Sequence, residues 1–192
     1  MKESNELQER APKLLSQIEP IENWRGTAIK KREQLKEFVE EPLLSACEEL
    51  YDKNIQTLSS SANKKDIEIG DVGIVIDFET LSEENRKIGL FVGKLSEGDG
   101  RQQINISIPV DKNTTVKDVQ TRAMEIVHQF QKQPMLWAEV YTLEDMQKAF
   151  PPDPENYNEK EYFDEIISYG YYYDPESKYF FLSKEHYDKT HE

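Results

Sequence analysis

The chain has 192 residues, with 38 acidic and 24 basic side chains and a formal net charge of −14 at pH 7. This length favours one folded domain, and the charge disfavours direct binding to nucleic acid or anionic membranes, because both contacts depend on Lys and Arg. A single cysteine excludes an intramolecular disulfide and a multi-cysteine zinc site. Neither a secretory signal nor a long apolar run is present, so the sequence predicts a soluble cytoplasmic protein.

The first quarter of the chain is predicted to be helical. Prolines limit a helix over residues 7–18 to a short lead-in. Apolar residues then recur at helical spacing from Thr27 to Tyr51, and Pro42 either kinks this helix or begins a second one. Asn54 tolerates the left-handed conformation that often closes a helix.

The next segment is predicted to contain β-strands. A short strand over residues 55–58 precedes a Ser-rich loop over 59–65. The dense β-favouring residues of 72–78 predict a central, buried strand. Another strand is expected over residues 90–95, because two glycines disfavour a long helix there.

Residues 104–110 alternate apolar and polar side chains, as expected for a strand with one buried face. Pro109 lacks an amide hydrogen, so either this strand lies at an edge or Pro109 lies beyond the last paired residue. Residues 115–131 combine a capping box with apolar residues at helical spacing, which predicts a helix.

The last part of the chain alternates between extended and helical patterns. Residues 135–141 are expected to return to the sheet as an extended segment, and 142–150 to form a short helix. Asn158 is expected to cap a further helix. Two β-prone runs over 169–173 and 179–182 flank an Asp-Pro turn, which predicts a β-hairpin.

This order of elements predicts an α+β fold, with a mainly antiparallel sheet, helices packed on one face, and a C-terminal helix and β-hairpin. Three parts are expected: a partly mobile N-terminal lead-in over residues 1–26, an α+β core over 27–150, and an acidic, Tyr-rich module over 151–192 that packs on the core.

Isolated reactive side chains give little support for catalysis. Cys47 lies on an apolar helical stripe beside two glutamates, which favours a buried packing role over a nucleophile. His128 flanks an apolar helix face, where a partly buried histidine is expected, whereas His186 and His191 lie near a chain end expected to fray. No cofactor motif is present in the sequence, and none is expected.

One enzymatic alternative rests on three carboxylates around the predicted central strand. Asp71 precedes this strand, and Asp77 and Glu79 lie at its carboxyl end. Oxygen ligands at the end of a buried strand are typical of sites that bind Mg²⁺ or Mn²⁺ for phosphoryl chemistry. The alternative prediction is therefore a divalent-metal-dependent hydrolase, either a nuclease or a phosphatase.

The main functional prediction comes from the last 54 residues, Glu139–Glu192. They hold 13 of the 20 aromatic side chains and have a local net charge of −9. Charge that steers a basic partner, together with Tyr side chains that anchor it, is typical of a recognition surface. The residues expected at this surface are Glu161, Asp164, Glu165, Tyr171, Tyr173, Asp174 and Glu176.

The sequence thus favours a non-enzymatic binding protein that masks or regulates a basic protein surface. An inhibitor, an immunity-type protein and a nucleic-acid mimic all belong to this class. The expected partner is a basic protein, and neither a metal nor another cofactor is part of this prediction.

Overall fold

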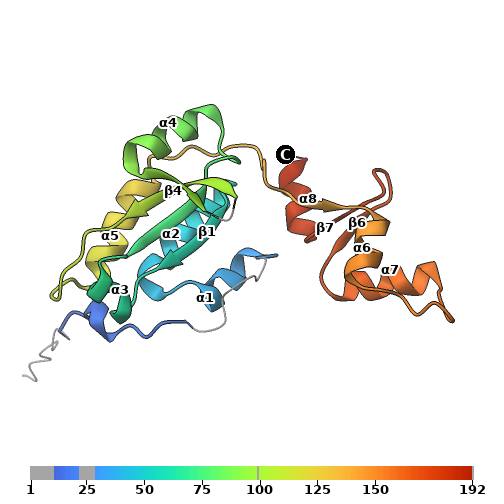
Figure 1. Ribbon diagram of the computed structural model, residues 1–192, viewed down its shortest axis with the longest axis horizontal. Coiled ribbons are helices and arrows are strands. Elements are labelled where there is room, and N and C mark those ends of the chain that lie inside the picture. Colours follow the sequence, from blue (N-terminus) through green and yellow to red (C-terminus); the bar gives the residue numbers. More distant parts are fainter. Residues whose placement is uncertain (1–10, 22–28, 99, 192) are drawn as a thin grey trace, which may run out of the picture.

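The computed structural model describes residues 11–21, 29–98 and 100–191, which form two units connected by residues 128–139 (Figure 1). The first unit contains a four-stranded antiparallel sheet in the order β1-β2-β4-β3. Its strands are β1 (Thr57–Ser61), β2 (Gly73–Asp77), β3 (Lys94–Gly98) and β4 (Arg101–Ser107). The second unit contains a three-stranded antiparallel sheet in the order β5-β7-β6. Its strands are β5 (Val140–Tyr141), β6 (Tyr172–Asp174) and β7 (Tyr179–Phe181).

Both units also contain helices. Those of the first unit are the 3-10 helices η1 (Leu15–Gln17) and η2 (Arg32–Gln34), and α1 (Leu35–Phe38), α2 (Glu41–Asp52), α3 (Lys64–Ile69), α4 (Glu83–Val92) and α5 (Val116–Val127). Those of the second unit are α6 (Leu143–Ala149), α7 (Glu159–Ser168) and α8 (Lys184–Thr190). The predicted α+β fold, with antiparallel sheets and a C-terminal helix and hairpin, is confirmed.

The main core lies on one face of the four-stranded sheet. Ile74, Ile76, Ile104 and Ile106 alternate along the two central strands, and each is at most 2% exposed. Helices α2 and α5 pack against this face, behind the strands in Figure 1. The opposite face carries the alternate residues of the same strands, which are mostly small and polar, and no described helix covers it in this view. Burial of one face and solvation of the other is common in antiparallel sheets.

Several local predictions are confirmed. Strand β2 is an interior strand, and Pro42 lies in the first turn of α2. Asn54 has a φ of 60°, which is the left-handed conformation expected after that helix. At the start of α5, the Asp118 amide donates to the Thr115 hydroxyl at 3.1 Å, as in the predicted capping box. Pro109 lies beyond the end of β4, which is itself an interior strand.

Two loop and strand predictions in the first unit were wrong. Residues 59–61 belong to β1, and α3 begins at Lys64, although 59–65 was expected to be a loop. Serine favours turns locally, but here the ladder with β2 supplies the partners for its backbone. Helix α4 continues through Gly89 to Val92, so a strand over 90–95 does not form. Gly89 fits because a Cβ there would already lie 3.2 Å from the side chain of Ile104.

The boundaries of the parts also differ from the prediction. Residues 135–141 do not return to the first sheet, because Val140 pairs with Phe181 of β7. Met146 of α6 belongs to the second hydrophobic cluster, so the second unit begins near residue 140 rather than at 151. Of the predicted lead-in, residues 11–21 pack on the core through Leu15, which is fully buried. The rest of the lead-in lies outside the described residues.

The two units touch through a small number of specific contacts. Lys30 Nζ donates to the Tyr169 carbonyl at 2.8 Å, and the Ser183 hydroxyl donates to the Lys30 carbonyl at 2.6 Å. His186 of α8 packs edge-on against Trp137, with ring centroids 5.1 Å apart. His186 has no solvent exposure, although the sequence placed it in a fraying tail. Docking of α8 on the first unit explains this difference.

Candidate functional site: an acidic surface on the second unit

The predicted recognition surface is centred on helix α7. The Asn158 side chain caps this helix by accepting from the amides of Lys160 and Glu161 at 3.0 and 3.2 Å. Tyr162 and Ile166 point into the second hydrophobic cluster. Their helical spacing leaves a solvent face that carries the exposed carboxylates Glu161, Asp164 and Glu165. We call these three residues the α7 acidic face.

The α7 acidic face is not neutralised within the described parts of the chain. None of its three carboxylates forms an ion pair with a described residue. Glu165 Oε1 accepts a hydrogen bond of 2.6 Å from the Tyr169 hydroxyl, and this bond raises the pKa of Tyr169. Glu161 lies three and four residues from Asp164 and Glu165, so like charges are neighbours on the helix surface.

The two predicted tyrosines are not part of this exposed face. Tyr171 is half-buried, with its ring 3.8 Å from Lys30 Nζ and edge-on to Tyr141. Tyr173 packs between Phe163 and Phe180, with centroid distances of 4.7 and 4.8 Å. Both rings therefore stabilise the second unit. The sequence suggested an exposed role because it does not show which side of a short strand meets a helix.

Asp174 also has a structural role rather than an exposed one. Its side chain is buried, and its two carboxylate oxygens accept from the amides of Glu176 and Ser177 at 3.2 and 3.0 Å. Hydrogen bonding from Ser177 lowers the pKa of Asp174. Asp174 thus fixes the turn between β6 and β7, and of the two acidic residues predicted for this hairpin only Glu176 is exposed. An Asp before Pro is typical of such a turn.

The three carboxylates of the alternative metal site are separated. Asp71 precedes β2, whereas Asp77 and Glu79 lie at its other end. Asp77 is buried and pairs with Arg101 at 2.9 Å, so its charge is already compensated. Glu79 accepts from the Gln102 amide at 3.1 Å.

Asp77 and Glu79 do line an open pocket of about 340 Å³ beside Trp137 and Glu139. However, among the residues that the structure describes, no three His, Cys, Asp or Glu side chains are grouped as metal ligands. The hydrolase hypothesis therefore receives no geometric support from the described residues.

The other reactive side chains are placed as follows. Cys47 is fully enclosed in the core, and burial raises the pKa of its thiol to about 12, as expected for a packing cysteine. His128 is more exposed than predicted, with its Nε2 3.0 Å from a carboxylate oxygen of Glu49. His186 lies at the junction of the units, and burial lowers its pKa to about 4. No signal in the sequence distinguished His186 from an ordinary tail histidine.

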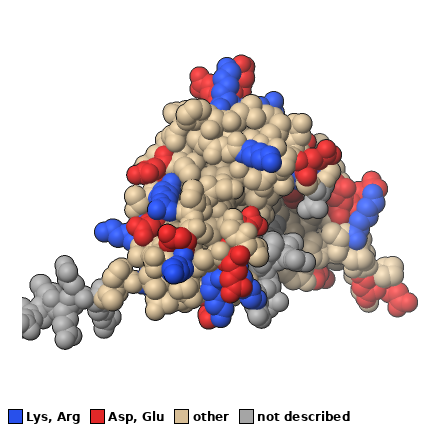
Figure 2. Space-filling view, turned by 60° about the vertical axis from the view of Figure 1, so that its left-hand side comes forward, with Lys and Arg blue, Asp and Glu red and all other residues tan. Residues whose placement is uncertain are grey.

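Charges elsewhere on the molecule are more mixed. Figure 2 shows acidic and basic side chains in neighbouring positions over much of one face, with a broad uncharged area between them. In the first unit, Lys13 pairs with Glu41 at 2.5 Å and Arg32 pairs with Asp52 at 2.9 Å. The unpaired carboxylates of α7 therefore differ from these compensated groups.

No described helix has both the length and the apolar character needed to cross a bilayer. No protein-family model, curated protein or solved structure matches the chain.

Proposed function

We propose that this protein is a non-enzymatic binding protein that recognises a basic partner through the α7 acidic face. The observation that carries the proposal is that Glu161, Asp164 and Glu165 are exposed, lie on one helix face and form no ion pair with a described residue. Masking a basic surface of another protein, as an inhibitor, an immunity-type protein or a nucleic-acid mimic does, uses this kind of surface.

Electrostatic repulsion within the α7 acidic face favours this function. Like charges three or four residues apart destabilise a helix by roughly 0.2–0.5 kcal/mol per pair. Glu161 forms such pairs with both Asp164 and Glu165. A bound Lys or Arg side chain would replace this repulsion by attraction, and the net charge of −14 would accelerate the encounter with a cationic partner.

Apolar contact area lies next to these charges. Ile167 and Tyr169 are 47% and 48% exposed, and both follow closely after Glu165 in the chain. The hydrogen bond from the Tyr169 hydroxyl to Glu165 holds this ring beside the carboxylate. Phe150 stacks on the same ring at a centroid distance of 5.5 Å, which leaves little freedom for the side chain to lose on binding. Charge and an ordered aromatic ring together suit a protein interface.

The proposal can be tested with a library of fluorescent Lys- and Arg-containing peptides, measured by anisotropy at increasing salt. The wild-type protein is expected to bind a subset of them, with an affinity that falls as salt rises. The triple variant Glu161→Gln, Asp164→Asn, Glu165→Gln is expected to bind about tenfold more weakly, because exposed ion pairs contribute roughly 0.2–1 kcal/mol each.

A matched control removes the same number of charges elsewhere. Glu68→Gln, Glu97→Gln and Glu125→Gln replace exposed carboxylates of the first unit that form no ion pair with a described residue. This control variant is expected to bind the peptides within about twofold of wild type. Equal losses in the two variants would show that only net charge matters, and the α7 acidic face would then be rejected as the binding surface.

A further inference from the structure

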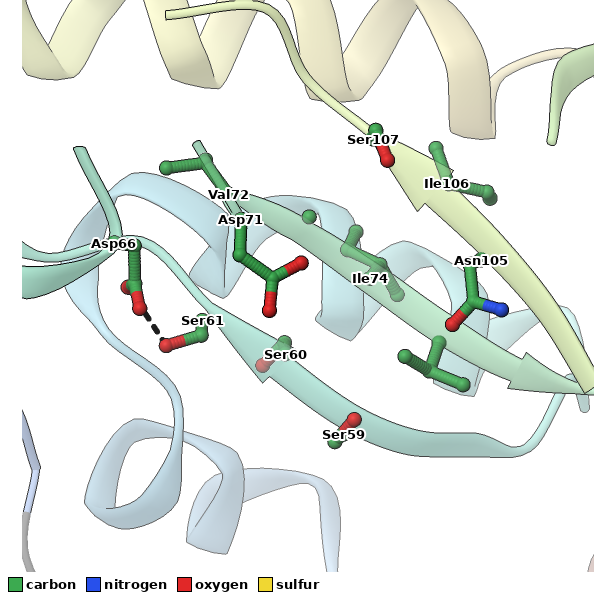
Figure 3. Close-up of a pocket in the computed structure, with 12 residues that line it drawn as sticks. Ser59, Ser60, Ser61, Asp66, Asp71, Val72, Ile74, Asn105, Ile106 and Ser107 are labelled. Carbon is green, nitrogen blue, oxygen red and sulfur yellow. Dashed lines mark hydrogen bonds between the residues drawn. The ribbon is translucent and has the colours of Figure 1, made fainter. Parts of the chain in front are cut away.

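A small pocket lies on the uncovered face of the four-stranded sheet (Figure 3). Its volume is about 260 Å³, and it is bounded by β1, β2, β4 and the turn from α3 to β2. Pockets that enclose whole small molecules usually measure about 300–1,000 Å³. The size therefore suits a side-chain terminus or a similar small group rather than a nucleotide.

The shape of the pocket comes from the register of the three strands. Two rows of residues cross its floor, Ser61–Gly73–Ser107 and Ser59–Val75–Asn105. The centre of the first row is empty of side-chain atoms because it is a glycine. A Cβ on Gly73 would lie only 2.1 Å from the Ile106 carbonyl oxygen, so the close approach of β2 and β4 requires glycine there. The hollow is thus a consequence of strand packing.

Two carboxylates form one end of the pocket. Asp66 is 8% exposed, and its Oδ2 accepts from the Ser61 hydroxyl at 2.7 Å and the Asn63 amide at 2.8 Å. Asp66 is therefore fixed before any ligand arrives. Asp71 forms no hydrogen bond or ion pair through its carboxylate with a described residue, and Figure 3 shows this carboxylate extending over the gap between β1 and β2.

The remaining polar groups are also available as acceptors. The Asn105 Nδ2 group donates to Ser96, which orients the side chain and leaves its carbonyl oxygen for another donor. The hydroxyls of Ser59 and Ser107 have no hydrogen-bond partner among the described residues and can accept as well. No Lys, Arg or His is among the described residues that line the pocket, so no positively charged side chain there favours an anion, and the two carboxylates disfavour one.

We propose that this pocket binds a guanidinium group. A guanidinium is planar, always charged and carries five N–H donors in a fixed arrangement. These donors match the acceptors around the pocket, which are the fixed carboxylate of Asp66, the free carboxylate of Asp71 and the neutral oxygens of Asn105, Ser59 and Ser107. The half-buried Val75 on the floor offers an apolar surface for the methylene groups next to the guanidinium. The pocket belongs to the first unit and is separate from the α7 acidic face, so this proposal goes beyond the proposed function and does not depend on it.

The proposal is tested by titrating the ¹⁵N-labelled full-length chain with three probes: free L-arginine, N-acetyl-L-arginine amide and N-acetyl-L-citrulline amide. Saturable shifts of the amide signals of Gly73, Asn105 and Ser107 are expected with the arginine probes. Citrulline has nearly the same shape without the charge, and we expect it to bind at least about tenfold more weakly, because hydrogen bonds between charged groups are stronger. Tighter binding of free arginine than of the blocked form would identify a small metabolite as the source of the guanidinium, and the reverse would identify a peptide chain.

Variants separate a specific site from general attraction by an acidic protein. Asp71→Asn is expected to weaken arginine binding about tenfold, and since the Asp71 carboxylate has no described partner, the fold is expected to be unaffected. Ser107→Arg is expected to fill the pocket from within and abolish binding. Glu68→Gln removes an exposed charge from the neighbouring α3 and is expected to change nothing.

Equal binding of citrulline and arginine, or unchanged binding by Asp71→Asn, would overturn the proposal. The α7 triple variant should bind arginine like wild type, so failure at either site can be recognised separately.

Discussion

The buried histidine between the two units makes the stability of this protein depend on pH. His186 has no solvent exposure, and neither of its ring nitrogens forms a hydrogen bond of normal geometry with a described residue. Burial is the main reason that its pKa falls from 6.5 to about 4; nearby Lys189 lowers it further, and the main chain of Ile29 offsets part of the shift. The folded protein thus strongly prefers a neutral imidazole.

The sign and size of the effect follow from this pKa. Because the folded state has the lower pKa, the unfolded chain takes up the proton first as the pH falls. The stability linked to neutral His186 is fully present above pH 6.5 and is lost as the pH falls towards 4. From the two pKa values, the loss is about 2 kcal/mol at pH 5 and about 3 kcal/mol at pH 4.

Urea unfolding of wild type and His186→Phe between pH 5 and pH 8, followed by circular dichroism, measures this effect. Phenylalanine retains a ring against Trp137 and Tyr51 but does not titrate. We expect the wild type to lose about 2 kcal/mol more than the variant between pH 8 and pH 5. His128→Gln, which changes an exposed histidine, is the control and should behave like wild type. Parallel pH profiles for wild type and His186→Phe would refute the reasoning.

Two further predictions concern groups in the first unit. Cys47 should not react with a thiol reagent in the native state, because its thiol is enclosed and its pKa is raised to about 12; stoichiometric labelling on mixing would contradict this. The buried Glu40 carboxylate accepts hydrogen bonds from the Ala62 amide at 3.1 Å and from Asn63 Nδ2 at 2.9 Å. Glu40→Ala would leave both donors without this partner, so it should lower the free energy of unfolding by about 3 kcal/mol in denaturant titrations. Glu37→Ala, an exposed control, should change it by less than about 0.5 kcal/mol, and equal effects would exclude this role for Glu40.

Part of the candidate site could be predicted from local pattern. The α7 acidic face was expected because apolar and acidic residues alternate at helical spacing after Asn158, and a helix orients both sets without help from distant residues. Asp174 was misplaced because its role is set by the geometry of the turn that it caps, which uses both carboxylate oxygens. Tyr171 and Tyr173 were misplaced because their cover comes from residues distant in the chain: Tyr141 and Lys30 contact the ring of Tyr171, and Phe163 of α7 packs on Tyr173.

The sequence alone determined the elements whose signals lie within a few residues: the interior strand β2, the capped helix α5, the left-handed Asn54 and the C-terminal hairpin. The tertiary structure decided the rest. It made Ser59–Ser61 a strand by pairing, separated Asp71 from Asp77, buried His186 against Trp137, and formed the pocket above Gly73. The physical reason is that backbone propensity and side-chain periodicity are local, whereas strand partners, burial and charge compensation come from residues far apart in the chain.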